Sequence, residues 1–239
     1  MNPEPLAGRR ALITGASRGI GRAIAESLAL AGADVVLVAR GIAGLTAVSK
    51  TIGERAEVRA CDVTDHGAVA ALADALMTAG RTPDILVNNA GLFPLAPLDE
   101  MDPVEFEATM RVNVLAPFFV LRALLPSFKT RRSGHVLTIG SVADRTVFAG
   151  NGAYAASKYA QRAMQEVLRQ ELKGTGVRST LVSPAATDTP IWDPIDPDHR
   201  PGFPTRVSML RPADVAEAVL WAVTRPAHVN VDEVRLSSS

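Results

Sequence analysis

The segment ALITGASRGIGRAIAESLALAGADVVLVAR, residues 11–40, constrains the fold of this chain more than any other stretch. An apolar run leads into a glycine-rich turn, an alanine-rich amphipathic stretch and a second β-branched run, which is the pattern of a βαβ unit. Gly15, Gly19 and Gly21 lack the β-carbons that would keep backbone amides and a helix N-terminus away from a pyrophosphate. The segment therefore predicts a nucleotide-binding turn, although a tight strand-to-helix turn without a ligand would carry the same glycines.

Short apolar runs and longer amphipathic stretches continue to alternate almost to the C-terminus. This alternation predicts an α/β fold, a doubly wound, Rossmann-like parallel sheet of seven strands with helices on both faces, in one domain spanning residues 1–239. The expected strands are residues 11–14, 34–39, 57–61, 85–88, 135–139, 177–182 and 229–236. The expected helices are residues 19–31, 45–53, 66–79, 103–128, 152–173 and 212–224.

Residues 187–209 break the alternation. Repeated prolines forbid a regular helix there, and two aromatic side chains give the segment large apolar surfaces. These residues are Pro190, Pro194, Pro197, Pro201, Pro204, Trp192 and Phe203. Because long irregular segments in compact domains commonly serve function, we expect a substrate lid.

The composition argues against several classes of partner. Lys plus Arg and Asp plus Glu both number 25, so no net charge attracts nucleic acid or anionic membrane. The single cysteine, Cys61, cannot form an intrachain disulfide, and the four scattered histidines indicate no metal cluster. Residues 1–10 lack the apolar core of a signal peptide, and no later apolar run is expected to reach the length of a membrane span. We therefore predict a cytoplasmic protein with no metal, no nucleic acid and no membrane attachment.

The end of the second strand bears on the choice of cofactor. In dinucleotide-binding folds an acidic residue there takes the ribose hydroxyls, whereas an arginine accommodates a 2′-phosphate. Here the strand ends at Arg40, and Arg18 in the glycine-rich turn can converge with it, so NADP(H) is preferred and NAD(H) remains possible. The alternative is a pair of solvated surface arginines. Asp62, after the third strand, can either accept a hydrogen bond from the adenine amino group or cap the next helix.

The stretch YAASK, residues 154–158, supplies candidate catalytic groups. Tyr154 and Lys158 lie one helical turn apart, and the ammonium is expected to lower the pKa of the phenol from its ordinary value of about 10. Ser141 follows a predicted strand, at the end where open α/β sheets place their ligand crevice. The alternatives are a tyrosine packed beside a surface lysine and a serine in an ordinary turn. Asn113 lies in an apolar helix and needs a polar partner if it is buried.

Several short motifs follow one another in a family-specific order. They are TGASRGIG at residues 14–21, CDV at 61–63, NNAG at 88–91, RVNV at 111–114, Ser141 and YAASK at 154–158. On these motifs the chain resembles the short-chain dehydrogenase/reductase family over nearly its whole length. The resemblance implies a tetrad in which Tyr154 is the general acid/base, Ser141 polarises the substrate carbonyl, Lys158 tunes the tyrosine and binds the nicotinamide ribose, and Asn113 holds a water that leads to solvent.

The resemblance also implies a set of cofactor contacts and an assembly. The implied contacts are Gly15, Ser17, Arg18, Gly19, Ile20, Gly21, Arg40, Asp62, Val63, Asn88, Ala90, Gly91, Tyr154, Lys158, Pro184, Thr187 and Thr189. Asn89 is expected to be structural only. Ala185 stands where the family usually has glycine, which would strain the backbone if the position needs positive φ. The long helices commonly form homodimers or homotetramers, and Met164, Val167 and Leu168 suit either such a face or the core.

The functional hypothesis is an NADP(H)-dependent oxidoreductase that moves hydride between nicotinamide and a small carbonyl compound or secondary alcohol. The alternatives are a catalytically silent dinucleotide-binding protein that senses redox state, and an epimerase or dehydratase on the same fold. Expected substrate-wall residues are mostly apolar: Phe93, Leu95, Trp192 and residues 142–148. Asp144 and Arg145 are the polar exceptions, and we expect both to be solvated.

Overall fold

Seven parallel strands form one sheet in the computed structural model, which describes residues 4–239. The strand order β3-β2-β1-β4-β5-β6-β7 confirms the predicted doubly wound arrangement, because the chain starts in the middle of the sheet and winds outward both ways. The strands are β1 (Arg10–Thr14), β2 (Asp34–Ala39), β3 (Ala56–Ala60), β4 (Ile85–Asn88), β5 (Gly134–Ile139), β6 (Val177–Pro184) and β7 (Glu233–Leu236).

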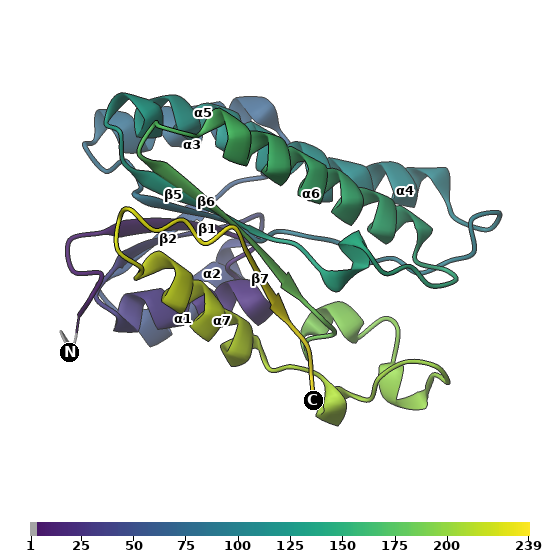
Figure 1. Cartoon of the computed structure of the whole chain (residues 1–239). Coiled ribbons are helices and arrows are strands. Elements are labelled where there is room, and N and C mark those ends of the chain that lie inside the picture. The colour runs from purple at the N-terminus through teal and green to yellow at the C-terminus, as the bar shows by residue number, and fades with distance from the viewer. Residues whose placement is uncertain (1–3) are drawn as a thin grey trace.

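Helices cover both faces of the sheet (Figure 1). One face carries α1 (Gly19–Leu30), α2 (Ile42–Ile52) and α7 (Pro212–Val223). The other face carries α3 (His66–Thr78), α4 (Pro103–Met110), α5 (Ala116–Thr130) and α6 (Gly152–Glu171). This three-layer arrangement leaves the carboxyl ends of the strands open to a cleft.

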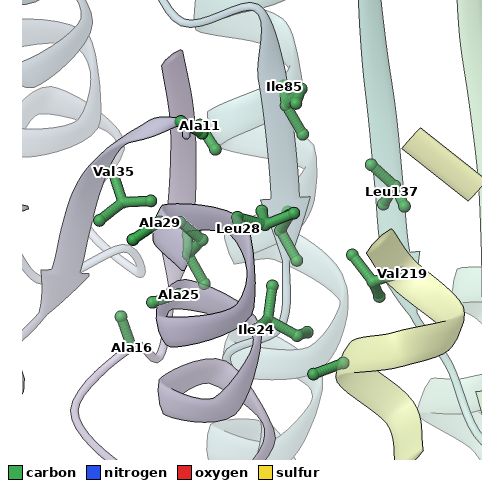
Figure 2. Packing of buried hydrophobic residues seen from close by; sticks show 14 of the residues in the cluster. Ala11, Ala16, Ile24, Ala25, Leu28, Ala29, Val35, Ile85, Leu137 and Val219 are labelled. Atoms are coloured by element: carbon green, nitrogen blue, oxygen red, sulfur yellow. The ribbon is translucent and has the colours of Figure 1, made fainter. Parts of the chain in front are cut away.

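Alternate residues of each strand supply the two cores, as the pleat requires. On β1, Ile13 packs in the cluster with α1 and α7, whereas its neighbour Leu12 packs in the cluster with α3 and α5. Figure 2 shows the first cluster, in which Ala25 and Leu28 of α1 lie against the sheet and Ile24 points toward α7. Alanines on α1 allow this helix to lie close to the strands, which fixes the turn that precedes it.

Most element boundaries differ from the prediction by one to three residues, and two differences are larger. The expected helix at 103–128 is interrupted between α4 and α5 by a π-helical segment, Arg111–Leu115. The seventh strand begins at Glu233 instead of residue 229 because the Asn230 side chain takes the place of a ladder partner. Its Oδ1 accepts from the Ser179 amide at 2.8 Å, and its Nδ2 donates to the Ser179 carbonyl at 3.1 Å.

The helical stretch Pro103–Thr130 runs through these segments with a mean hydropathy of 1.4 over its apolar window. Its length and composition would suffice to cross a membrane, so the expectation that no run reaches this length was wrong. A helix packed in a protein core passes the same test. This stretch contributes buried residues to the cluster beside the sheet, among them Val120, Leu124 and Phe128. Its length and composition alone therefore do not show that it crosses a membrane.

Residues 187–209 form an irregular segment at the carboxyl end of β6, drawn in light green in Figure 1. It contains three 3₁₀ turns, Pro190–Trp192, Pro197–His199 and Arg206–Ser208, and no regular helix, as the prolines predict. Arg206 fastens the segment, because its guanidinium donates to Asp188 and Asp193, each at 2.7 Å. The segment is therefore held in one conformation beside the strand ends.

Candidate active site

The glycine-rich turn between β1 and α1 packs tightly on the loop that follows β4. Gly15 has φ 67°, and a β-carbon there would lie 2.9 Å from the Ala90 Cα, so only glycine fits. Asn89 holds this turn, since its Nδ2 donates to the Thr14 carbonyl at 2.9 Å and to the Gly15 carbonyl at 3.3 Å. Gly21 allows the first turn of α1 to touch the Gly15 carbonyl. The backbone of the turn is thus fixed before any ligand arrives.

A cavity of about 930 Å³ extends from this turn along the strand ends to the irregular segment. Ligand sites of this kind typically enclose about 300–1,000 Å³, so the cavity fits a dinucleotide together with a small substrate. It is lined by most of the implied cofactor and catalytic residues: Gly15, Ser17, Arg18, Gly19, Ile20, Arg40, Asp62, Val63, Ala90, Gly91, Ser141, Tyr154, Lys158, Pro184, Thr187 and Thr189. Gly21, Asn88 and Asn113 do not line it.

Two exposed arginines stand at the nucleotide end of the cavity. Arg18 and Arg40 both line it, and within residues 4–239 neither forms an ion pair with a carboxylate. Their guanidinium groups therefore remain available to an anion such as a 2′-phosphate.

Asp62 lies in the same part of the cavity but does not cap the next helix. Its Oδ1 accepts from the Thr64 amide at 2.9 Å and from the Thr64 hydroxyl at 2.8 Å. These hydrogen bonds, and then the nearby charge of Arg40, hold the pKa of Asp62 below its ordinary value. Asp65 caps α3 instead, because its side chain accepts from the Gly67 and Ala68 amides.

Tyr154 and Lys158 project from the first turns of α6 into the other end of the cavity. The Lys158 Nζ lies 5.4 Å from the centroid of the Tyr154 ring and donates to the Ile139 carbonyl at 3.0 Å. Ser141 follows β5 and lines the same part of the cavity. Its Oγ accepts a hydrogen bond from the Ala143 amide at 3.1 Å. The helix α6 and the loop after β5 thus bring one phenol, one ammonium and one hydroxyl to the same end of the cavity.

The electrostatics of this pair differ from the expectation. Burial raises the pKa of Tyr154 to about 12, against an opposing effect of its hydrogen bond with Ser141. Burial also lowers the pKa of Lys158 to about 8, which a negative charge on Asp144 partly offsets. The expected lowering of the Tyr154 pKa by Lys158 was wrong. The Lys158 ammonium bonds to the Ile139 carbonyl, and the dense packing around Tyr154 disfavours its charged phenolate form. A protonated phenol at neutral pH is suited to donate a proton.

Asn113 sits inside the π-helical segment and is fully buried. Its Oδ1 accepts from the Leu92 amide at 2.8 Å, and its Nδ2 donates to the Leu92 carbonyl at 3.0 Å and to the Ser157 Oγ at 2.9 Å. The asparagine therefore has the polar partners that its burial requires. It ties the loop after β4 to α6, so it positions the helix that carries Tyr154.

Asp144 was expected to be solvated, and this was wrong. The residue is 0% exposed in a 3₁₀ turn after Ser141, where the Ser183 Oγ donates to its Oδ2 at 3.3 Å. Burial raises the pKa of this carboxyl. Arg145 is also engaged, through Glu233 of β7 at 2.7 Å. No periodicity in the sequence of this loop indicates the burial, because the partners come from β6 and β7.

The substrate end is lined by aromatic rings, only some of which the sequence analysis named. Phe93 packs edge-on against Tyr154 with 4.5 Å between centroids, and against Trp192 with 5.0 Å. Phe203 lies next to Trp192 at 6.2 Å and lines the cavity, although the sequence analysis did not place it in the wall. Leu95, which it did place there, does not line the cavity.

The loop after β6 accommodates the alanine that departs from the family pattern. In residues 4–239 the non-glycine residues with positive φ are Arg132 and Asp196, so Ala185 carries no such strain. Its amide donates to the Leu236 carbonyl at 2.8 Å. Thr189 lies close to Gly19, where an added β-carbon would approach it to 3.2 Å. The irregular segment therefore starts directly over the glycine-rich turn.

The sequence and fold match a known family. A family model for short chain dehydrogenases matches residues 9–200. The chain belongs to the short-chain dehydrogenase family. It is 38% identical over 228 residues to an uncharacterised oxidoreductase of Staphylococcus saprophyticus, covering 94% of each chain.

Solved structures of family members share the whole fold. A metagenomic short-chain oxidoreductase in complex with NADP is 36% identical, with a TM-score of 0.85 and coverage of 98% of this chain and 99% of that one. An alcohol dehydrogenase from Thermococcus sibiricus, complexed with 5-hydroxy-NADP, is 31% identical, with a TM-score of 0.86 and coverage of 96% of both chains. The family resemblance derived from the motifs is thereby confirmed, and the protein is a short-chain dehydrogenase-family oxidoreductase.

Proposed function

We propose that this protein is an NADP(H)-dependent oxidoreductase that interconverts a small carbonyl compound and the corresponding alcohol. One observation carries the proposal: Ser141, Tyr154 and Lys158 line the same cavity as the glycine-rich turn and its two free arginines. A silent dinucleotide-binding protein has no need of a half-buried phenol and a buried ammonium beside the cofactor. The NADP bound by two structural relatives supports the choice of cofactor.

The chemistry assigns one task to each side chain. When bound, NADPH supplies the hydride for the carbonyl carbon. Ser141 donates a hydrogen bond to the carbonyl oxygen and aligns it. Tyr154, protonated at neutral pH because of its raised pKa, gives its proton to the same oxygen, so that carbonyl plus hydride plus proton yields the alcohol.

Lys158 returns a proton to the Tyr154 oxygen after each turnover. Its ammonium is held near the ring by the Ile139 carbonyl, from where it passes a proton to the phenolate left after transfer. The proton then returns from solvent through the lysine, with a water at the Asn113 backbone as the outward link. The bonds of Asn113 to Leu92 and Ser157 hold this residue against the loop after β4 and α6, and the water itself is a prediction from the family resemblance.

We further propose that residues 1–239 act as one catalytic domain in the cytoplasm and that the irregular segment 187–209 is the substrate lid. A homodimer or homotetramer fits the outer helices, since Phe118 on α5 and Val167 on α6 are exposed apolar residues. Leu168 is buried in the core and Met164 is partly buried, so Val167 is the main candidate on α6 for such a face.

A spectrophotometric screen tests the proposed function. NADPH oxidation is followed with aldehydes, diketones, 3-keto acids and quinones, with NADH in parallel. We expect net, carbonyl-dependent consumption of NADPH and slower consumption of NADH. Epimerisation or dehydration would instead change the substrate without net NADPH loss, and binding of NADPH without any turnover would favour a sensor.

A further inference from the structure

The substrate end of the cavity is enclosed by a row of aromatic rings that starts at Tyr154. Phe93 meets Tyr154 at an interplanar angle of 63° and Trp192 at 73°. Phe203 continues the row, at 73° to Trp192 and at 86° to Phe148. These edge-to-face contacts join the loop after β4, the loop before α6 and the irregular segment into one apolar wall.

The polar atoms of this wall are already occupied. The Trp192 Nε1 donates to the Thr187 carbonyl at 3.1 Å, so the indole offers its hydrocarbon surface to the cavity. Trp192 is only 7% exposed, which fixes the ring in place. Near the wall, the hydroxyl groups of the lining are those of Ser141, Thr146 and Tyr154, and Ser141 and Tyr154 are the two expected to hold a carbonyl oxygen.

Most charged side chains of the lining lie at the opposite end, and Lys158 is the exception. Among residues 4–239 the charged side chains that line the cavity are Arg18, Arg40, Asp62 and Lys158. The first three belong to the glycine-rich turn and to the ends of β2 and β3, and the Lys158 Nζ bonds to the Ile139 carbonyl. Outside the lining, Arg145 and Arg206 are held by carboxylates. Arg200 is exposed outside the lining, with its guanidinium carbon 5.0 Å from the centroid of the Phe203 ring. Among the rings that line the cavity, an ionised group would therefore lose water without a charged lining side chain on the aromatic wall itself.

We propose, building on the function proposed above, that the substrate is an uncharged carbonyl compound with an aromatic ring or a similarly flat apolar group. The carbonyl oxygen faces Ser141 and Tyr154, and the ring packs among Phe93, Trp192 and Phe203. These three residues then determine specificity, because they contact the ring instead of the reacting atoms.

A pair of substrates that differ by one charge tests this assignment. Methyl phenylglyoxylate and phenylglyoxylate share the ketone and the ring, but only the second carries a carboxylate. We expect kcat/KM with NADPH to be higher for the ester by about 100-fold or more, as for burial of a charge without a partner. Equal values, or a preference for the acid, would overturn the substrate class and leave carbonyl reduction standing.

Binding without turnover separates this proposal from the proposed function. Because the chain has two tryptophans, Trp221→Phe leaves Trp192 as the only reporter of fluorescence. Trp221 is 49% exposed on α7 and does not line the cavity, so this variant should keep wild-type kinetics. We expect benzamide to quench Trp192 saturably and benzoate at the same concentration not to do so. If benzamide quenches Trp192 saturably but the protein reduces no carbonyl compound, the proposed function is wrong and the aromatic binding site stands. If benzamide does not quench Trp192, the aromatic binding site is wrong.

Single substitutions sharpen the assignment to the wall. Trp192→Leu and Phe93→Leu should each raise KM for methyl phenylglyoxylate about tenfold, with a smaller change for ethyl pyruvate, which has no ring. Trp221→Leu, at an exposed tryptophan on α7 that does not line the cavity, serves as the matched control and should change neither. Equal losses with both substrates would contradict the proposal, because the rings would then only support the fold of the segment.

Discussion

The end of the cleft that we propose for the nucleotide is formed by a tightly packed glycine-rich turn, whereas the end that we propose for catalysis is formed by side chains in dense surroundings. Gly15 and Gly21 are fixed by steric limits, and the charged groups beside them, Arg18 and Arg40, stay exposed. Tyr154 and Lys158 sit in dense surroundings that displace both pKa values. Substitution of the exposed arginines should therefore change cofactor binding at the first end. At the second end, the pKa values depend on the groups packed around Tyr154 and Lys158.

The largest effect should follow from a change at the catalytic end. Tyr154→Phe removes the proton donor and little volume, so kcat should fall by about 10³-fold while NADPH affinity changes little. Steady-state kinetics and fluorescence titration with NADPH measure the two quantities. Tyr159→Phe is the matched control, because Tyr159 is on the same helix but does not line the cavity. Wild-type turnover in the Tyr154 variant would show that another group delivers the proton.

A charge reversal at the nucleotide end should have a smaller effect, confined to cofactor choice. Arg40→Asp places a carboxylate where a 2′-phosphate would lie, so the ratio of kcat/KM for NADPH to that for NADH should fall by about 10- to 100-fold. Arg22→Asp changes an exposed arginine of α1 that pairs with Glu26 and should leave this ratio unchanged. If the wild type uses both cofactors equally, the role given to Arg18 and Arg40 is wrong.

The pH dependence should show how the buried carboxylate acts on the catalytic end. Reduction requires protonated Lys158, so activity should fall as the pH rises through the lysine pKa of about 8. The negative charge of Asp144 raises this pKa, and Asp144→Asn should therefore move the fall in activity to lower pH. Asp34→Asn, at a half-exposed carboxyl at the start of β2 that pairs with Arg10 and does not line the cavity, provides the comparison. A pH profile that is the same in wild type and Asp144→Asn would exclude Asp144 from the electrostatics of the pair.

The two ends also differ in how far the sequence could predict them. The glycine spacing and the apolar alternation depend on residues close in sequence, so the turn, the sheet and the outer helices could be derived from them. The burial of Asp144 depends on Ser183, which is 39 positions away, and the aromatic contacts of Phe93 depend on residues of α6 and of the irregular segment. Such distant partners leave no local pattern.

The helix that carries Asn113 shows the same limit. The apolar pattern predicts one helix, and the π-helical interruption arises where the Asn113 side chain bonds to Leu92 and Ser157 across the structure. The shortened β7 has a similar cause, in the bonds of Asn230 to Ser179. In both places a side-chain amide takes over backbone partners, and the periodicity of the sequence contains no information about that exchange.

The most direct test of the central claim follows a single hydrogen. Wild-type protein is mixed with methyl phenylglyoxylate and NADPH that carries deuterium at the transferred position of the nicotinamide, and the product is analysed by mass spectrometry. We predict one deuterium on the carbinol carbon, formed in step with NADPH loss, and almost no product with Tyr154→Phe. Product without deuterium, or equal product from the Tyr154 variant, would contradict the claim that this cleft reduces a carbonyl with Tyr154 as the proton donor.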